Sequence, residues 1–413
     1  MTVKIKKVNK FSIGISQNFE FFKSCQTIFI EKVDEKDLDD SFHKSIKPIA
    51  CFVQFMFLMP VCGIKSDNPK NLKFKWCSLR VLITLAYIFY GIIIACLYFD
   101  SIRKNIDAMN AVGLIFFTYT TICTIIFLTI AIKWPRMMKQ WSNVEEKFLH
   151  SPYRKTDWKL SKKIKIVAVT VIILAFFEHL LYLANSAFNI YQDVVKNNLT
   201  VDEPLNHFLK SQFGYIYLDV PFSVPLGVFN EIMNMSFTFG WNYMELFVMM
   251  ISLGLSTRFK QINERLKNFK EKILSEQQWS KIREDYSSLC NLVAIIDFDL
   301  RYLILLSNLN NVYFICFQLL NIFEKLPYVI NTIYFWFSLI YLASRTFVAQ
   351  FLAASIHESA KFPIQIISSI PHEGWCNEMQ RFADQARAQD VALSGMKFFN
   401  LTRKSILSVI IFL

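Results

Sequence analysis

Long apolar blocks alternate with charged segments along the 413-residue chain. As a helix, a block of about 20 apolar residues crosses the roughly 30 Å hydrocarbon core of a bilayer. Six blocks reach that length, at residues 81–99, 112–132, 164–184, 228–255, 302–323 and 329–352. The pattern predicts an all-α, polytopic membrane protein built as a bundle of seven transmembrane helices.

The seventh apolar block, Ser405 to Leu413, is too short to cross the membrane. Its nine residues rise only about 14 Å as a helix. Lengthening it backward would draw Lys397, Arg403 and Lys404 into the bilayer, where each charge costs about 2.5–3.5 kcal/mol at the centre. We therefore predict an incomplete seventh transmembrane helix over 396–413, from either a short isoform or a gene-model artefact.

The segments between the blocks predict a cytoplasmic helical layer. Within the N-terminal region 1–80, the stretch 46–64 is apolar but interrupted by Pro60 and Gly63, which favours an interfacial or re-entrant segment. The charged stretch 257–299 lacks glycine and proline, and predicts two helices that extend the bundle. In the linker 354–395, a further helix over 375–391 is expected after the breakers Pro363, Pro371 and Gly374.

The distribution of charge predicts the orientation. Segments 1–80, 133–165, 256–301 and 354–394 hold 36 of the 45 Lys and Arg, whereas 100–111, 187–227 and 324–328 hold 5. By the positive-inside rule the N-terminus is cytoplasmic. The sequon Asn198-Leu199-Thr200 then lies outside, where Asn198 is a candidate glycosylation site.

Composition excludes several function classes. The chain is 54% hydrophobic and only 19% charged, so its net charge of +12 reflects membrane topology rather than nucleic-acid binding. None of the nine cysteines lies in a predicted outside loop, and no metal-binding spacing, phosphate-binding loop or nucleophile motif occurs. We therefore predict no enzymatic activity, no cofactor and no metal site.

Polar residues inside the apolar blocks are the candidate functional groups, because they are expensive in lipid and should face the bundle interior. Such residues recur at helical spacing in three blocks, toward the predicted outer end. Aromatic faces beside carboxylates and amides suit a sugar, whose C–H groups and hydroxyls they match. The candidate ligand-binding residues are Glu178, Tyr182, Glu231, Asn234, Trp241, Asn242, Asn331, Tyr334 and Trp336. Alternatively, these groups bond one another and hold the helices together.

Several segments resemble one known family. They are PVCGI at 60–64, FGWNYMELFVMMISLGLSTRFKQINERL at 239–266, FDLRYLILLSNLNNVYFICFQLLNIF at 298–323, SIHE at 355–358, LSGMKFF at 393–399 and LTR at 401–403. Together they resemble the sugar-receptor clade of the insect gustatory receptors. The end departs from that family, whose last span continues through a Thr-Tyr-Glu-type motif to a Gln-Phe-like terminus.

The resemblance implies a seven-helix receptor with a cytoplasmic N-terminus, which binds a sugar at the plasma membrane of taste neurons. It also implies a homo- or heterotetrameric cation channel, with a central pore lined by the last helix and candidate pore residues Ser405, Ser408, Val409 and Phe412. Alternatives are a non-conducting subunit acting only in heteromers, a G-protein-coupled receptor or a transporter. A G-protein-coupled receptor is disfavoured because the charge bias places the N-terminus inside and because the motifs of that class are missing. A transporter is disfavoured by the scarcity of broken helices.

Overall fold

The computed structural model describes residues 40–104, 108–153, 158–197, 203–218, 220–268, 274–323 and 325–406. Most of this part of the chain is helical, which confirms the predicted all-α class. The helices are α2 (Phe42–Phe55), α3 (Leu79–Lys104), α4 (Ala108–Glu145), α5 (Leu160–Lys196), α6 (Pro204–Gln212), α7 (Val224–Lys267), α8 (Glu276–Leu320), α9 (Val329–Ile367) and α10 (Asn377–Ala388). Short 3₁₀ turns lie at η2 (Pro69–Asn71), η3 (Glu146–Phe148), η4 (Asn321–Phe323) and η5 (His372–Gly374), and a small hairpin pairs β1 (Ser394–Gly395) with β2 (Phe399–Asn400).

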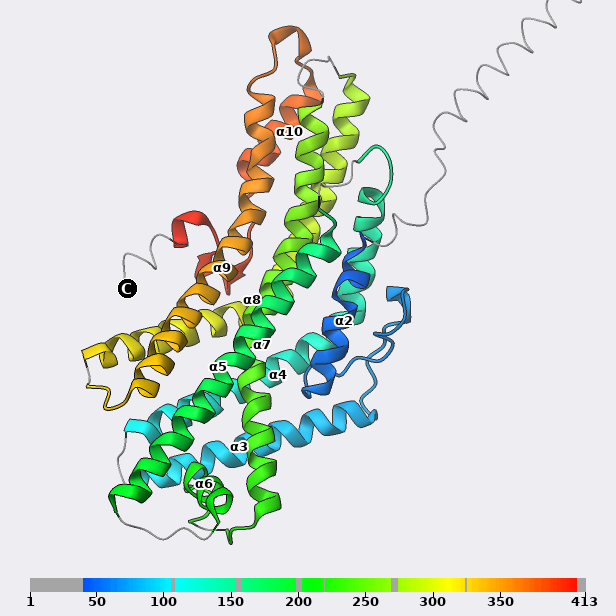
Figure 1. Cartoon of the computed structure of the whole chain (residues 1–413). Coiled ribbons are helices and arrows are strands. Elements are labelled where there is room, and N and C mark those ends of the chain that lie inside the picture. The colour runs from blue at the N-terminus through cyan, green and yellow to red at the C-terminus, as the bar shows by residue number, and fades with distance from the viewer. Residues whose placement is uncertain are drawn as a thin grey trace, which may run out of the picture.

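The long helices run beside one another between an end that carries α10 and an end that carries α6 (Figure 1). We call these the α10 end and the α6 end. Helix α7 packs against α4, α5, α8 and α9. Every residue from Asn242 to Phe259 except Leu253 is buried, so α7 is enclosed by protein over five turns of helix. It is the central element against which the candidate site is built.

Within the described residues, four helices are long and apolar enough to cross a membrane: Leu79–Lys104, Ala111–Phe148, Leu160–Lys196 and Val329–Ile367. Only 28% of the most apolar part of α3 is buried, as expected of a helix that faces lipid. The predicted blocks 228–255 and 302–323 lie in α7 and in α8 with η4, which are long but more polar. A helix enclosed by neighbouring helices tolerates those polar residues because they face protein and not lipid.

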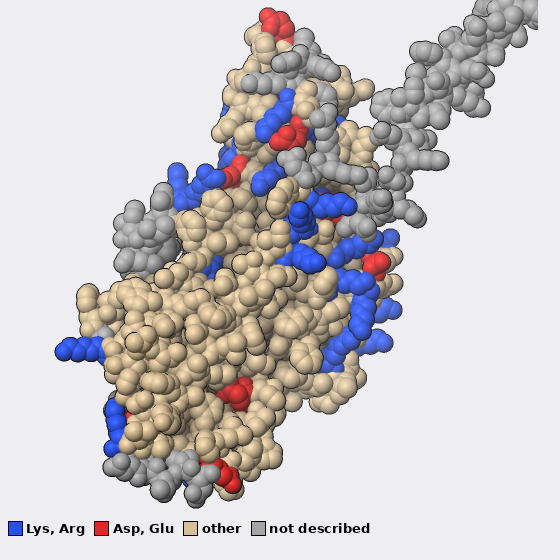
Figure 2. Space-filling view, viewed as in Figure 1, with Lys and Arg blue, Asp and Glu red and all other residues tan. Residues whose placement is uncertain are grey.

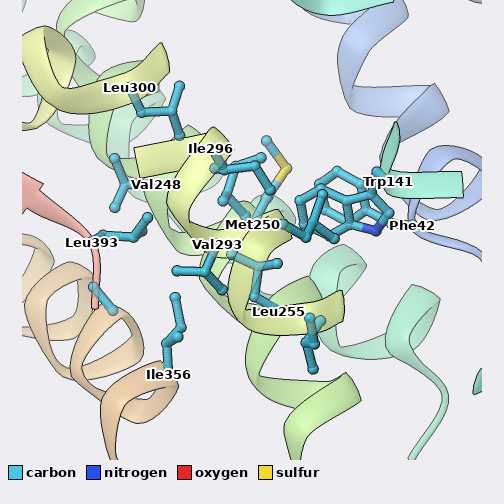
Figure 3. Close-up of a cluster of buried hydrophobic side chains, with 14 of the residues drawn as sticks. Phe42, Trp141, Val248, Met250, Leu255, Val293, Ile296, Leu300, Ile356 and Leu393 are labelled. Carbon is cyan, nitrogen blue, oxygen red and sulfur yellow. The ribbon is translucent and has the colours of Figure 1, made fainter. Parts of the chain in front are cut away.

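A continuous apolar core joins α2 to the segment after α10 (Figure 3). Phe42 stacks on Trp141 with ring centroids 4.0 Å apart. Gly254 passes beside this pair, and a Cβ there would stand 2.6 Å from the Trp141 ring and 2.7 Å from Phe42. The close approach therefore requires glycine. The same core includes these further residues labelled in Figure 3: Val248, Met250, Leu255, Val293, Ile296, Leu300, Ile356 and Leu393.

Helix α9 continues through Pro363, which was predicted to break it, and ends at Ile367. Proline has no N–H and leaves the carbonyl four residues earlier without its helical partner. Here that carbonyl belongs to Ser359, and it accepts a hydrogen bond of 2.8 Å from the Asn263 side chain on α7. A partner on another helix thus replaces the missing bond. The predicted helix over 375–391 corresponds to α10.

The predicted start of the seventh transmembrane helix at 396 is occupied by the β1–β2 hairpin instead. Met396 and Lys397 adopt positive φ angles of 52° and 65°, which an α-helix excludes. Buried Asp297 on α8 holds the hairpin: it accepts hydrogen bonds from the Ser394 N–H at 2.5 Å and from the Ser394 hydroxyl at 3.1 Å, and it pairs with Lys397 at 2.7 Å. Helical structure begins only at Arg403.

The predicted interfacial segment 46–64 is divided in the structure. Helix α2 ends at Phe55, and Pro60 and Gly63 lie in the loop that follows. The α2 N-terminus is fixed by the buried Glu145 carboxylate, which accepts the Phe42 N–H at 3.0 Å and pairs with Arg258 at 2.6 Å. This arrangement packs α2 onto the bundle, against α4 and α5.

Candidate functional site

Buried polar side chains from α5, α8 and α9 meet near the α6 end of the bundle. Glu178 on α5 accepts a hydrogen bond of 3.2 Å from the Ser338 hydroxyl on α9. That hydroxyl in turn accepts one of 3.1 Å from Gln318 on α8. Within the described residues, no Lys, Arg or His lies within ion-pair distance of Glu178. An acidic group with one neutral partner therefore sits between three helices.

A second group of contacts joins α5 to α6. Gln212, at the end of α6, donates a hydrogen bond to the Tyr182 hydroxyl and accepts one from Ser186. The Tyr182 ring lies 6.1 Å from the Tyr334 ring on α9 and 5.9 Å from the His179 ring, measured between centroids. The helix connection thus covers a cluster of aromatic rings.

Asn331 closes the α6 end of the contact between α5 and α9. Its side-chain amide donates hydrogen bonds to Asn185 at 2.7 Å and to Asn189 at 2.9 Å. Its oxygen accepts the Tyr328 N–H at 3.2 Å, which caps α9. These three contacts satisfy the group, so Asn331 holds the helices together.

Glu231 and Asn234, on the same face of α7, differ from this pattern. Both Glu231 carboxylate oxygens are buried and make no hydrogen bond to any described residue. His179 Nε2 lies 3.4 Å from the carboxylate, close enough for an ion pair but without hydrogen-bond geometry. The Asn234 side chain is 9% exposed and is also without a hydrogen-bond partner in this part of the chain. One helical turn of α7 therefore presents two polar groups that are unused within the described residues.

A more deeply buried network follows at the middle of α7. Glu245 pairs with Arg345 of α9 at 2.6 Å, and both side chains are at most 3% exposed. Asn311 of α8 donates to the same carboxylate. Asn242 accepts hydrogen bonds from Arg345 and, at 2.8 Å, from Tyr341. Three helices are thus linked by one compensated ion pair.

Trp241 connects this network with the aromatic groups around it. The Arg345 guanidinium lies 5.1 Å from the centre of the Trp241 ring, at cation–π distance. The same ring packs against Phe314 at 5.0 Å and Phe116 at 5.9 Å, while its N–H is buried without a hydrogen-bond partner among the described residues. Arg345 is therefore held by charge on one side and by aromatic rings on the other.

Below Glu245 lies a cavity of about 20 Å³, which has room for about one water molecule. It is lined by Ser307, Asn308, Asn311, Thr346, Gln350 and Leu401, besides Glu245 and apolar groups. The Asn311 oxygen and the Thr346 hydroxyl have no partner among the described residues. A water there would satisfy them and connect the network to the segment just before Arg403.

The structure brings eight of the nine predicted ligand residues onto facing sides of α5, α7 and α9, and leaves one outside. Trp336 is 44% exposed and contacts Phe335 at 5.7 Å. It lies two residues from Tyr334, which turns it about 200° around the helix and away from the cluster. Asn198, Ser408, Val409 and Phe412 lie outside the described residues.

Ser405, the remaining predicted pore residue, is part of a helix start. Its hydroxyl accepts the Thr402 N–H at 2.8 Å and contacts the Asn400 carbonyl at 2.8 Å. Thr402 accepts the Ser405 N–H in return, at 3.4 Å. In this structure Ser405 therefore lies in the first turn of the helix that begins at Arg403 and forms a reciprocal cap with Thr402.

Several members of these networks were absent from the predicted site. Gln212 belongs to a polar connecting segment, and its sequence carries no signal of a buried contact. Asn311 and Gln318 do carry one, because both are polar residues within the apolar block 302–323. Applying the rule for intramembrane polar residues to that block as well finds both.

Comparison with known proteins decides the family. A family model described as trehalose receptor matches residues 9–412. The chain belongs to the sugar clade of the insect gustatory receptors. It is 35% identical over 367 residues to the Drosophila melanogaster gustatory receptor for sugar taste 64a, covering 88% of this chain and 80% of that protein. It is 29% identical over 372 residues to gustatory receptor 5a for trehalose of the same species, covering 90% and 82%.

The fold of this gustatory receptor is that of an insect olfactory receptor. The structure of olfactory receptor OR5 from Machilis hrabei in complex with eugenol superposes with a TM-score of 0.62 at 11% identity, covering 89% of this chain and 94% of that one. A second structure of olfactory receptor OR5 superposes with a TM-score of 0.59 at 10% identity. The gustatory receptor is thus a multi-pass membrane protein of a receptor family and not an enzyme, which confirms both predictions.

Proposed function

We propose that this gustatory receptor is a sugar-gated, non-selective cation channel subunit in the plasma membrane of taste neurons. The main support is the cluster near the α6 end, where carboxylates, amides and aromatic rings from α5, α7 and α9 face one another inside a membrane helix bundle. Its relatives include a receptor for sugar taste and a receptor for trehalose, which supports a sugar as the ligand class.

Glu231 is the group that best fits sugar recognition. A buried carboxylate without hydrogen bonds is an unfilled acceptor, and sugar hydroxyls are donors. The rings of Tyr182 and Tyr334 supply apolar faces of the kind that cover sugar C–H groups. Trp241 and Asn242 lie deeper, where bound ligand would reach the Glu245–Arg345 pair.

The proposed topology follows from charge. The α10 end carries the segments rich in Lys and Arg and is assigned to the cytoplasm, with the N-terminus. The α6 end then faces outside, as does the sequon at Asn198. The proposed assembly is a homo- or heterotetramer, with Ser405, Ser408, Val409 and Phe412 at the pore.

Gating would follow from a difference in sugar affinity between closed and open states. The network from Asn242 through Arg345 and Glu245 to Asn311 ends at the small cavity that Leu401 helps to line. A shift of α7 against α9 would therefore be transmitted to the segment that precedes Arg403.

The test is sugar-evoked cation current in cells that express the chain alone or with related subunits, using a panel that includes trehalose. We expect Glu231→Gln and Trp241→Ala to abolish the current at unchanged surface expression. Trp336→Ala is the matched control, because that side chain is exposed, and it should retain the current. Undiminished responses in both variants would exclude this cluster as the sugar-binding site; sugar uptake without current would favour a transporter.

A further inference from the structure

The loop between α2 and α3 has a defined backbone conformation. Cys62 and Lys73 pair through two backbone hydrogen bonds, of 2.8 and 3.0 Å. Gly63 makes the turn with φ of 86°, and a Cβ there would stand 2.3 Å from the Asn71 carbonyl oxygen. Ile64 and Leu72 are buried beneath the loop. We call residues 62–78 the basic loop.

Helix α2 holds the basic loop in place. The His43 ring nitrogen Nε2 lies 2.9 Å from the Ser66 carbonyl oxygen, and Lys47 pairs with Asp67 at 2.7 Å. Arg80, at the start of α3, donates to the Val61 carbonyl at 3.1 Å. The loop therefore presents a defined outer face.

That outer face is positively charged. Lys65, Lys70, Lys73 and Lys75 are all exposed. None has a carboxylate within ion-pair distance among the described residues. Figure 2 shows Lys and Arg side chains gathered over α2 and the loop that follows it, beside a broad surface without charge. Four unneutralised lysines on one loop form a site for negative charge.

The same face borders the lipid-facing surface of the bundle. Trp76 is 61% exposed and Leu79, the first residue of α3, is 71% exposed. Phe74 packs edge-on against Trp76 at 5.1 Å. Exposed tryptophan at the end of a membrane-crossing helix is typical of the bilayer interface. The lysines thus lie at headgroup level if α3 spans the membrane.

We propose that the basic loop binds the headgroups of anionic phospholipids, with Trp76 inserted at the interface. In the cell these lipids would be those of the inner leaflet. This choice of leaflet rests on the orientation proposed above, whereas lipid binding itself does not depend on it. The acidic residues at 31–39, which include Asp34, Glu35 and Asp37, offer an alternative partner by charge. Lipid fits better because it covers both the lysines and the apolar surface of Trp76 and Leu79.

The test uses the full chain in lipid nanodiscs that contain phosphatidylserine and phosphatidylcholine in equal amounts. Bromine, which quenches tryptophan on contact, is placed on one lipid or on the other. The Trp76 signal is the difference between wild type and Trp76→Phe. We expect bromine on phosphatidylserine to quench it at least roughly fivefold more strongly, the enrichment that one lysine beside an anionic surface provides.

Replacing Lys65, Lys70, Lys73 and Lys75 together by Gln should remove this preference, as should about 1 M salt. Substituting Lys196 and Lys210, from the α6 end, should leave it intact. Equal quenching by both lipids, or a preference that survives the fourfold variant, would overturn the proposal. Quenching that appears only after deletion of residues 31–39 would show that this acidic segment, and not lipid, occupies the basic loop in the full chain. No arm uses sugar or current, so failure here is distinct from failure of the proposed function.

Discussion

The buried Glu245–Arg345 pair makes a quantitative prediction about what holds the site together. The two charges lie 2.6 Å apart with side chains at most 3% exposed. Asn242 accepts a hydrogen bond from Arg345 and Asn311 donates one to Glu245, while the buried Arg345 Nη2 has no partner among the described residues. Replacing Arg345 by Met leaves the Glu245 carboxylate buried with one neutral donor. Removing one partner of a buried pair costs about 3–5 kcal/mol, whereas removing both is often neutral.

We therefore expect Arg345→Met to lower the free energy of unfolding by about 3 kcal/mol or more. Adding Glu245→Gln to it should restore all but about 1 kcal/mol, because no uncompensated charge remains. The measurement is SDS-induced unfolding of the purified chain in mixed micelles, for both single variants and the double variant.

The control is the exposed pair Glu264–Lys267, whose side chains are 53% and 49% exposed and lie 2.7 Å apart. Its coupling should stay below about 1 kcal/mol, since water screens exposed charges. If the double variant at 245 and 345 is as unstable as the sum of the two single variants, the pair is not coupled and the reasoning is refuted.

Three further predictions concern contacts outside the candidate site. Asp297→Asn should loosen the hairpin at Ser394 and increase its hydrogen–deuterium exchange, while exchange in α5 stays unchanged. Asn263→Ala leaves the buried Ser359 carbonyl without a partner and should cost about 1–3 kcal/mol, visible as a lower melting temperature. Burial holds the pKa of His43 below its ordinary 6.5, so the unfolded chain binds the proton more readily. Stability should therefore fall as the pH drops below about 6.5, and this loss should shrink in His43→Gln; an unaltered pH profile would contradict the assignment.

Much of the candidate site could be predicted because polar residues in apolar blocks carry a periodic signal. Glu231, Asn234, Asn242 and Glu245 repeat at helical spacing, and the structure places them on one face of α7. The same periodicity could not predict which way the Trp336 side chain faces, because an aromatic residue is common both on lipid-facing surfaces and in ligand-binding sites. Its position two residues from Tyr334 turns it outward.

The sequence by itself determined the all-helical membrane architecture, the family and the stripes of polar residues, because these depend on local composition and on the 3.6-residue repeat. The tertiary structure alone decided which polar groups satisfy one another and which are left without partners. Asn331 and Glu231 look alike in the sequence, yet one is fully bonded and the other is not. Likewise, α9 passes Pro363 only because Asn263 of another helix reaches the carbonyl that proline leaves free. Such pairings join residues far apart in the chain, and local pattern carries no information about them.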